Sequence, residues 1–430
     1  MAFYICTNCE YGSASWIGKC PSCGAWNTMA ARPESSLINK DREGIKRMTL
    51  TPLSKIKTNK KEKKITGIFE FDRVLGVGFV PGEVILLTGE PGVGKSTLLL
   101  QALQKLNTIY ISGEESAEQI KDRAERLNIH LDSFSFSSDL QVDGIIEYIE
   151  QTEHKPDVLV IDSIQTVYSR DIEAAPGSIN QLKECVSKLI GLAKKEHIIV
   201  IVIGHITKEG DVAGPKTLEH LVDCVLNFEG ETVSSFRVLR ASKNRFGSTD
   251  EIGIFEMRQG GLHEVTNPLV FLDTRDELVS GKSIVGVNEG RRQLFYEIQT
   301  LAVSTSLSIP RRVVKGVDYN KVQLLLAVIK KHLSLQLDGY DIYVNVIGGV
   351  KIVSPLADLG IIASFYSSLK NIPISKQTVF VGEVGLLGEV RKGFHEEKLI
   401  QESKRLGFKN IYSSKNIDSV QKITNIIVRG

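Results

Sequence analysis

Short apolar runs alternate with helical patterns between residues 65 and 265, which is typical of a parallel β-sheet covered by helices on both faces. The strand-length apolar runs lie at 84–88, 108–112, 158–162 and 197–203. Apolar positions recur with helical spacing at 97–106 and 179–193. Residues 237–254 alternate like a hairpin whose turn lies at 243–247. The pattern therefore predicts an α/β domain.

The chain on either side of this region has a different pattern. From residue 281 onward it predicts a mixture of strands and helices, including an amphipathic helix at 320–333 and a strand within 339–349. A chain of 430 residues is also too long for one ordinary core. We expect four parts, which are a cysteine-rich segment at 1–30, a basic linker at 31–64, the α/β domain at 65–265 and an α+β domain at 266–430.

The composition indicates a globular protein without a membrane segment. The formal net charge is only +2, so a nucleic-acid surface would have to be local. Residues 1–6 show no signal-peptide pattern, and apolar runs such as 198–203 are far too short to span a bilayer. A cytoplasmic protein is expected.

The clearest chemical motif is a glycine-rich turn between an apolar strand and a helix, of the form G-x-x-x-x-G-K-S. Its backbone N–H groups and the helix N-terminus would face the phosphates of a nucleotide. Lys95 can reach the β- and γ-phosphates, and the Ser96 hydroxyl can hold Mg²⁺. A turn without a ligand would not need this Lys-Ser pair. The predicted nucleotide-binding residues are Gly89, Glu90, Pro91, Gly92, Val93, Gly94, Lys95, Ser96 and Thr97.

Acidic residues follow two of the predicted strands, where an open α/β sheet places its ligands. Glu114 and Glu115 follow the second strand. Ser116 and Gln119 then form a capping box that would begin a helix. A carboxylate in this place can orient the water that attacks a γ-phosphate, although either glutamate could be a solvated loop charge. Asp162 ends a buried strand, as a Mg²⁺-organising carboxylate does in such nucleotidases.

Other polar groups near these strands allow two interpretations each. His205 could sense the γ-phosphate, although a lone histidine is more often structural. Lys243 and Arg245 flank an asparagine in the hairpin turn, and could contact phosphates or form an ordinary basic turn. The lysine run at 55–64 is either a solvated segment or a contact for a nucleic-acid backbone.

Two C-x-x-C turns separated by ten residues predict a four-thiolate Zn²⁺ site. So small a segment buries too little to fold alone, so the metal would supply its folding free energy. Two disulfides or an iron–sulfur site are the alternatives. The predicted ligands are Cys6, Cys9, Cys20 and Cys23, whereas Cys185 and Cys224 are expected to be small buried side chains.

Taken in order, these motifs resemble the bacterial RadA (Sms) family of DNA repair proteins, which are RecA-superfamily ATPases. The resemblance covers nearly the whole chain, and the sequence Lys-Asn-Arg-Phe-Gly at 243–247 is particularly specific to it. It also rests on Ser-Gly-Glu-Glu-Ser at 112–116 and on the segments 159–163, 204–210 and 218–223.

The resemblance implies a RecA-like fold that binds ATP and Mg²⁺ and hydrolyses ATP when DNA stimulates it. It implies movement on single-stranded DNA, as in a helicase of the DnaB type, and branch migration or unwinding during homologous recombination. The implied partners are single-stranded and branched DNA, further copies in a homohexameric ring, and the RecA recombinase. No membrane partner is implied.

The resemblance also assigns roles to residues. It makes Lys95 and Ser96 the phosphate and Mg²⁺ ligands, with Asp162 supporting the Mg²⁺. It favours Glu114 over Glu115 as the residue that activates water.

The family pattern gives the basic hairpin turn a role between subunits. Lys243 and Arg245 would reach the ATP of a neighbouring subunit or couple its hydrolysis to DNA. Hydrolysis would then depend on ring assembly. These two residues and His205 complete the expected catalytic set.

Residues 266–430 resemble the C-terminal domain of the Lon protease, whose chemistry needs a serine activated by a lysine. Where the protease pattern reads Pro-Ser-Ala-Gly, this chain reads Pro-Leu-Ala-Asp at 355–358. Glu396 aligns with the lysine, and Lys398 lies close by. We therefore expect a proteolytically inactive scaffold for the ring. Its candidate DNA contacts are Arg291, Arg292, Arg311, Arg312 and Lys315.

Two other functions remain open at this point. An ATP-dependent protease would explain an ATPase joined to a Lon-like domain, but Leu356 cannot act as its nucleophile. A nucleotide switch without motor activity could instead recruit repair partners through the zinc ribbon.

Overall fold

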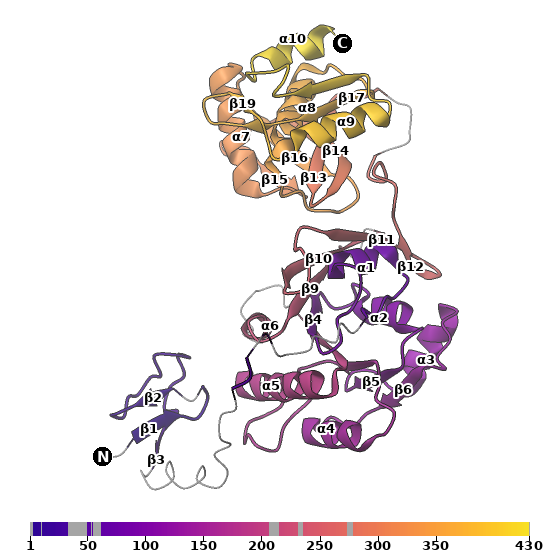
Figure 1. The fold of residues 1–430 in the computed structure, drawn as a ribbon. Coiled ribbons are helices and arrows are strands. Elements are labelled where there is room, and N and C mark those ends of the chain that lie inside the picture. The colour runs from indigo at the N-terminus through magenta and orange to yellow at the C-terminus, as the bar shows by residue number, and fades with distance from the viewer. Residues whose placement is uncertain are drawn as a thin grey trace.

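The computed structural model describes residues 3–9, 11–32, 50–52, 54, 62–205, 215–230, 235–272 and 278–429. Within these residues the strands form a three-stranded sheet, a nine-stranded sheet and a six-stranded sheet, in that order along the chain, and a two-stranded ribbon that lies within the last of these regions. Figure 1 shows helices on both faces of the nine-stranded sheet, and the six-stranded sheet beyond its β10–β11 edge.

The N-terminal sheet is formed by β1 (Phe3–Cys6), β2 (Gly12–Ser13) and β3 (Met29–Arg32). Both β2 and β3 pair antiparallel with β1. We call residues 3–32 the cysteine ribbon. Its small buried core consists of Cys6, Cys20 and Met29, with Tyr4, Cys9 and Ile17 packed against them.

The nine-stranded sheet contains β4 (Val84–Gly89), β5 (Thr108–Ser112), β6 (Phe134–Ser137), β7 (Val158–Asp162), β8 (Ile199–His205), β9 (Cys224–Glu229), β10 (Phe236–Asn244), β11 (Ile252–Arg258) and β12 (Gly261–Glu264). The order across the sheet is β12-β11-β10-β9-β4-β8-β7-β5-β6. The strands from β9 to β6 are parallel, and β10, β11 and β12 extend the sheet antiparallel. Every residue of β4 and β7 is buried, as expected for central parallel strands.

Helices cover both faces of this sheet, so alternate residues of β4 pack into two different cores. Ile85 and Leu87 pack with α1, α2 and α3, whereas Val84 and Leu86 pack with α4 and α5. The helices are α1 (Phe69–Leu75), α2 (Lys95–Leu103), α3 (Ala117–Arg126), α4 (Val142–Gln151), α5 (Ile179–Glu196) and the short α6 (Pro215–Leu218).

The C-terminal sheet has the order β15-β16-β14-β13-β17-β20 and mixes parallel with antiparallel pairs. Its strands are β13 (Lys282–Glu289), β14 (Arg292–Ser304), β15 (Arg312–Lys315), β16 (Tyr340–Val346), β17 (Thr378–Val381) and β20 (Asn410–Ser413). The pair β18 (Glu383–Val384) and β19 (Val390–Arg391) forms the two-stranded ribbon. The helices are α7 (Tyr319–His332), α8 (Asp358–Lys370), α9 (Glu396–Arg405) and α10 (Lys422–Arg429), with a 3₁₀ turn at Pro355–Ala357.

The turn between β13 and β14 joins this region to the nine-stranded sheet. Arg292 forms a buried ion pair with Glu70 of α1, with 2.7 Å between Nη1 and Oε2. Arg240 of β10 forms another with Glu289, at 2.6 Å. Phe271 packs edge-to-face against Phe236 at the same place, with ring centroids 4.9 Å apart. We call this contact the junction. Its apolar residues Val238, Ile252 and Ile254 belong to the C-terminal core.

The expected strands and helices agree with the structure except at some ends. Ser116 and Gln119 form the expected capping box at the start of α3. The strand expected at 197–203 begins instead at Ile199, because His197 ends α5 in a left-handed conformation with φ of 59°. The pattern could not show where the helix stops, since its apolar run continues directly into the strand.

Candidate functional site

The glycine-rich loop turns between β4 and α2, as its spacing predicts. Gly92 and Gly94 have φ of 77° and 110°, a region that side chains with a Cβ rarely enter. A Cβ on Gly94 would also lie 2.8 Å from Cε of Met257. The two glycines therefore let the backbone turn sharply into the N-terminus of α2, where the backbone N–H groups attract anions.

Lys95, the first residue of α2, folds back over the loop. Its Nζ donates to the carbonyl oxygens of Gly89 at 2.9 Å and Glu90 at 3.1 Å. Burial lowers the pKa of Lys95, and the carboxylates of Asp162 and Glu114 oppose this effect. The ammonium is thus held at the mouth of the loop, within the field of two acids.

Ser96 and Asp162 meet at the start of α2 and the end of β7. The Ser96 hydroxyl donates to Oδ2 of Asp162 at 3.0 Å, and the Tyr110 hydroxyl donates to the same oxygen at 2.6 Å. Burial raises the pKa of Asp162 despite these hydrogen bonds, and nearby carboxylates raise it further. A cation between the hydroxyl and the carboxylate would relieve that repulsion, so the donor set fits Mg²⁺.

Glu114 and Glu115 have different partners although they are adjacent. Oε1 of Glu114 accepts a hydrogen bond from the hydroxyl of Ser163 at 2.5 Å, which places it beside the residue after β7. Glu115 is held by both guanidinium nitrogens of Arg123 on α3, at 2.7 and 2.5 Å. Glu114 is therefore the carboxylate that faces the centre of the site.

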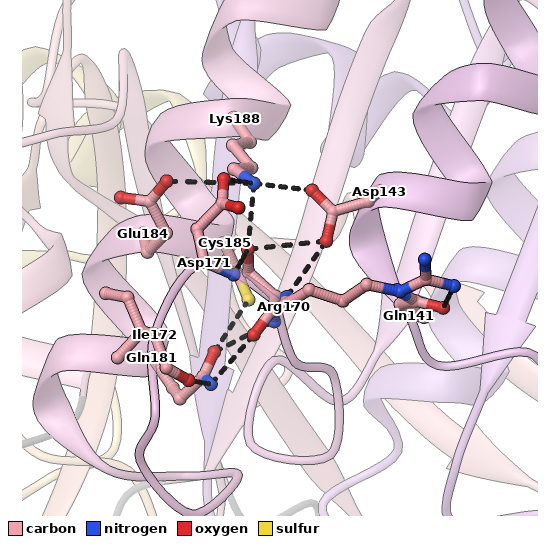
Figure 2. Close-up of polar contacts among 10 residues, drawn as sticks. Gln141, Asp143, Arg170, Asp171, Ile172, Gln181, Glu184, Cys185 and Lys188 are labelled. Atoms are coloured by element: carbon pink, nitrogen blue, oxygen red, sulfur yellow. Dashed lines mark hydrogen bonds and ion pairs between the residues drawn. The ribbon is translucent and has the colours of Figure 1, made fainter. Parts of the chain in front are cut away.

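The segment that follows Asp162 is held against α4 and α5 by a polar cluster (Figure 2). The ammonium of Lys188 on α5 forms ion pairs with Asp143 of α4 and, at 2.6 Å, with Asp171 of the segment. Gln181 bonds the backbone of the same segment, donating to the carbonyl oxygens of Ser169 at 3.0 Å and Ile172 at 2.8 Å. These contacts fix the path of the chain beyond the acid.

His205 is the last residue of β8, which pairs with β4 so that His205 lies opposite Gly89. Its backbone therefore reaches the edge of the sheet from which the glycine-rich loop begins. The His205 side chain lies outside the described residues, as does the expected polar loop at 206–214. Most of the expected basic linker, from 33 to 49 and from 55 to 61, is outside them too.

Lys243 and Arg245 lie near the end of the sheet at which β4 begins. The glycine-rich loop of their own chain lies at the other end, where β4 stops. Asn244 pairs with Cys224, which pairs with Ile85 near the start of β4. Four strand residues, or roughly 13 Å, separate Ile85 from the last residue of that strand.

This basic turn is held in place by local contacts. Nζ of Lys243 donates to the carbonyl oxygen of Glu219 at 2.8 Å. Nη1 of Arg245 is 3.0 Å from Oδ1 of Asp223, and half of the Arg245 side chain is exposed. The ordered turn thus presents a partly exposed cation to the surface.

Three residues near the loop were missed by the sequence analysis. The hydroxyl of Tyr110 bonds Asp162, and Arg123 bonds Glu115. Arg237 of β10 donates from Nε to the carbonyl oxygen of Val93 inside the loop, at 2.9 Å. The available signals were a tyrosine within an apolar strand and an arginine between two apolar residues, because both must bury a polar group.

The C-terminal region also approaches the loop. A cavity of about 580 Å³ is lined by Gly89 and Glu90 on one side, and by Val317 and Lys351 on the other. Strands β9 and β10 form its floor, including Arg240. The sequence contained no signal for this contact, because it depends on how two distant segments pack.

The four N-terminal cysteines converge as their spacing predicts. Their sulfur atoms all lie within 4.8 Å of one another, with 3.7 Å from Cys6 to Cys23 and 3.4 Å from Cys9 to Cys20. A tetrahedral Zn²⁺ site with Zn–S bonds near 2.3 Å separates its sulfurs by about 3.8 Å. None of the chain's six cysteines, all of them among the described residues, forms a disulfide. The ligand set therefore fits Zn²⁺.

The two positions aligned with the serine and lysine of the protease hold a leucine and a glutamate. Leu356 is buried in the 3₁₀ turn, and Glu396 is completely buried at the start of α9. Glu396 accepts hydrogen bonds from Ser414 at 2.7 Å and from the N–H of Gly393 at 3.1 Å, while Lys398 is exposed. Leu356 therefore packs in the core, and Glu396 accepts hydrogen bonds that hold the start of α9.

One expected DNA contact is not available to a ligand. Arg292 has a nearly buried side chain that is paired with Glu70, and its Nη2 also donates to the carbonyl oxygen of Val265 at 2.6 Å. The expectation is therefore wrong for Arg292, because this arginine belongs to the junction. Arg291, by contrast, has an 82% exposed side chain.

Among the described residues, no helix is long and apolar enough to cross a membrane.

Two family models match segments of the chain. Residues 70–211 match an AAA domain, and residues 4–31 match a rubredoxin metal binding domain. The crystal structure of the RadB recombinase is 26% identical and matches 46% of this chain and 98% of its own, with a TM-score of 0.38. The expected fold class is confirmed, with a RecA-like P-loop α/β core, a four-cysteine zinc ribbon and a mixed α/β C-terminal region.

Curated relatives match nearly the full chain. The DNA repair protein RadA of Bacillus subtilis is 45% identical over 439 residues, which is 99% of this chain and 95% of the relative. RadA of Listeria monocytogenes is 44% identical over 98% of this chain and 93% of its own. Identity at this level over nearly the whole length shows common descent, and the chain therefore belongs to the RadA family of DNA repair proteins.

Proposed function

We propose that this protein is a DNA-dependent ATPase of recombinational DNA repair. It couples ATP hydrolysis to movement on single-stranded DNA, and so to branch migration and unwinding of recombination intermediates. The observation that carries the proposal is the meeting of Ser96 with Asp162 beside Glu114, directly behind the glycine-rich loop. The names of the relatives, as DNA repair proteins, support the role in repair.

Each residue of the site has a defined part in hydrolysis. The loop N–H groups and Lys95 bind the phosphates, and Ser96 with Asp162 would hold Mg²⁺. A Mg²⁺ ion held there would supply neutralisation of the phosphate charge. Glu114 orients a water for attack on the γ-phosphorus and accepts its proton, while the bond between the β,γ-bridging oxygen and the γ-phosphorus breaks to give ADP and phosphate.

Lys243 and Arg245 act on the nucleotide of a neighbouring subunit. They lie at the opposite end of the strands from the glycine-rich loop of their own chain, which supports a role in trans. Charge supplied across a subunit boundary makes turnover depend on assembly, as for an arginine finger. We propose a homohexameric ring in which His205 senses the γ-phosphate and the Lon-like domain is a proteolytically inactive scaffold. The RecA recombinase and branched DNA are the proposed partners.

ATPase assays with and without a single-stranded oligonucleotide test this proposal. We expect DNA to raise the turnover of the wild type, and Lys95→Ala to abolish it. Lys121→Ala is a matched control, because Lys121 is an exposed lysine of α3. The proposal fails if DNA changes neither ATPase nor oligomeric state.

A branch-migration assay on a forked intermediate separates the motor from a nucleotide switch. Strand displacement that requires ATP and is lost in Lys95→Ala is the result expected for a motor. Slow hydrolysis without displacement would instead indicate a switch that recruits partners. Degradation of casein would indicate a protease, which the leucine at position 356 argues against because it cannot act as a nucleophile.

A further inference from the structure

Both tryptophans of the chain lie in the cysteine ribbon, and both are largely exposed. The chain contains two tryptophans, Trp16 and Trp26, and these side chains are 54% and 69% exposed. Neither belongs to the buried core of the ribbon, which consists of two cysteines and Met29 with three partly buried neighbours. A domain this small has few apolar side chains to bury, so leaving its largest two in water is costly. Packing therefore does not account for them.

The two indole rings flank one short segment of backbone. The ring of Trp16 lies over Gly18, since a Cβ on that glycine would be 3.6 Å from Cη2 of the indole. The next residue, Lys19, forms a β-bridge with Trp26, and its Nζ lies 5.5 Å from the centre of that ring. Two flat apolar surfaces and one cation thus occupy neighbouring positions on the ribbon. Tyr11, which is 40% exposed, adds a third ring to the same small domain.

The expected basic linker, which adjoins the ribbon in the sequence, has a local excess of positive charge. Residues 31–64 contain eleven lysines and arginines against four acids, whereas the whole chain has a net charge of only +2. Local positive charge next to exposed aromatic rings is the combination used to bind single-stranded nucleic acids, because the charge follows the phosphates while the bases stack. A protein partner would use the aromatic rings but would have no need of so much positive charge beside them.

We propose that the cysteine ribbon binds single-stranded DNA by stacking bases on Trp16 and Trp26, while Lys19 contacts the phosphates. The inference rests on the proposed function for the presence of DNA, but it names a site apart from the ATPase centre. Every base offers a flat face, so binding is independent of sequence. Bases in a duplex are already stacked on one another, so single strands are preferred.

Intrinsic fluorescence tests this site directly, because both tryptophans of the chain lie in the ribbon. Titration of the full-length protein with oligo(dT) is expected to quench the emission, whereas a duplex of equal length leaves it largely unchanged. Trp16→Ala and Trp26→Ala are each expected to weaken oligo(dT) binding about tenfold, since one stacked base contributes about that factor. Trp26→Phe should retain most of the affinity, because phenylalanine also stacks.

Two controls separate the site from its surroundings. Tyr148→Ala on α4 removes an aromatic ring that is 64% exposed but outside the ribbon, and it should bind like the wild type. Each tryptophan variant must still bind one Zn²⁺ per chain, which shows that the ribbon is folded. If oligo(dT) leaves the wild-type emission unchanged, or a zinc-loaded double variant binds it with full affinity, the inference is overturned.

The outcome is separable from that of the ATPase proposal. In Lys95→Ala, quenching by oligo(dT) is expected to persist although turnover is lost. Quenching in a wild type whose ATPase ignores DNA would support the ribbon site and contradict the motor. DNA-stimulated turnover without quenching would support the motor and contradict the ribbon site.

Discussion

Arg123 holds Glu115 with both of its guanidinium nitrogens, at 2.7 and 2.5 Å, and so ties this glutamate to α3. The neighbouring Glu114 instead accepts a hydrogen bond from Ser163, next to Asp162. A bidentate ion pair occupies both oxygens of the Glu115 carboxylate, so they are not free to orient a water. The two adjacent glutamates are thus placed for different tasks.

Replacing Glu114 should therefore affect turnover far more than replacing Glu115. We expect Glu114→Gln to lower kcat by about 10²- to 10⁴-fold, because general-base catalysis contributes about that much. Glu115→Gln keeps a hydrogen-bonding group for Arg123 and should lower kcat less than about tenfold. Steady-state ATPase assays at saturating ATP compare the two. Equal losses in both variants would contradict the assignment of the base.

Mixing two inactive variants tests the action of Arg245 across subunits. Lys95→Ala lacks a functional loop, and Arg245→Ala lacks the cation for its neighbour. In mixed rings some interfaces combine an intact loop with an intact Arg245, so ATPase activity should return. We expect the recovery to depend on the mixing ratio and to be largest near equal amounts. Mixtures as inactive as either variant alone would count against a shared site.

The ion pair of Glu70 with Arg292 should contribute strongly to stability. Glu70 is completely buried, and burial raises its pKa while Arg292 and Arg73 oppose the rise. Removing Arg292 leaves a buried carboxylate without its main partner, so Arg292→Met should lower the free energy of unfolding by about 3–5 kcal/mol. Urea denaturation followed by circular dichroism measures this change.

A control for this variant is available one residue away. Arg291→Ala removes an 82% exposed side chain, whose ion pair with Glu251 at 3.4 Å contributes at most about 1 kcal/mol. The double variant Glu70→Gln/Arg292→Met should recover part of the loss, because no charge then remains buried alone. If Arg292→Met is as stable as Arg291→Ala, the ion pair does not anchor the junction.

The cluster around Lys188 should make stability depend on pH in acid. Burial raises the pKa of Asp143, but the hydrogen bonds from Lys188 and from the N–H of Arg170 outweigh this effect and lower it. Its folded-state pKa is thus below the unfolded value of about 3.9, so the stabilisation is complete above that pH. It is lost as the pH falls through the folded-state pKa.

Comparison with Asp143→Asn isolates this contribution. The stability difference between the wild type and Asp143→Asn should be largest near about pH 7 and shrink below about pH 4. Urea midpoints at several pH values measure it, with Asp132→Asn at an exposed site as a control. A difference that stays constant into acid would show that Asp143 acts by packing rather than by charge.

Much of the fold and the centre of the site could be predicted from the sequence, because they depend on local patterns. The strands of β4 and β7, the turn at Gly92 and the acid at Asp162 each follow from neighbouring residues. The choice between Glu114 and Glu115 could not be made from spacing, since it depends on the position of α3.

Contacts between distant segments could not be predicted from the sequence either, because they also depend on where other elements lie. Arg292 has the sequence surroundings of a surface arginine, yet it is buried against Glu70, which lies 222 positions earlier in the chain. Arg237 likewise reaches the loop at Val93, which lies 144 positions earlier in the chain. Such contacts follow from packing between distant segments, which an apolar pattern does not encode.

The junction has a practical consequence for producing parts of this protein. A fragment ending at residue 265 would uncover Val238, Ile252 and Ile254, whose cover comes from the C-terminal core. It would also lack Glu289 and Arg292, the partners of Arg240 and Glu70. Such a fragment is expected to aggregate on expression, whereas one that keeps residues 65–429 should remain dispersed.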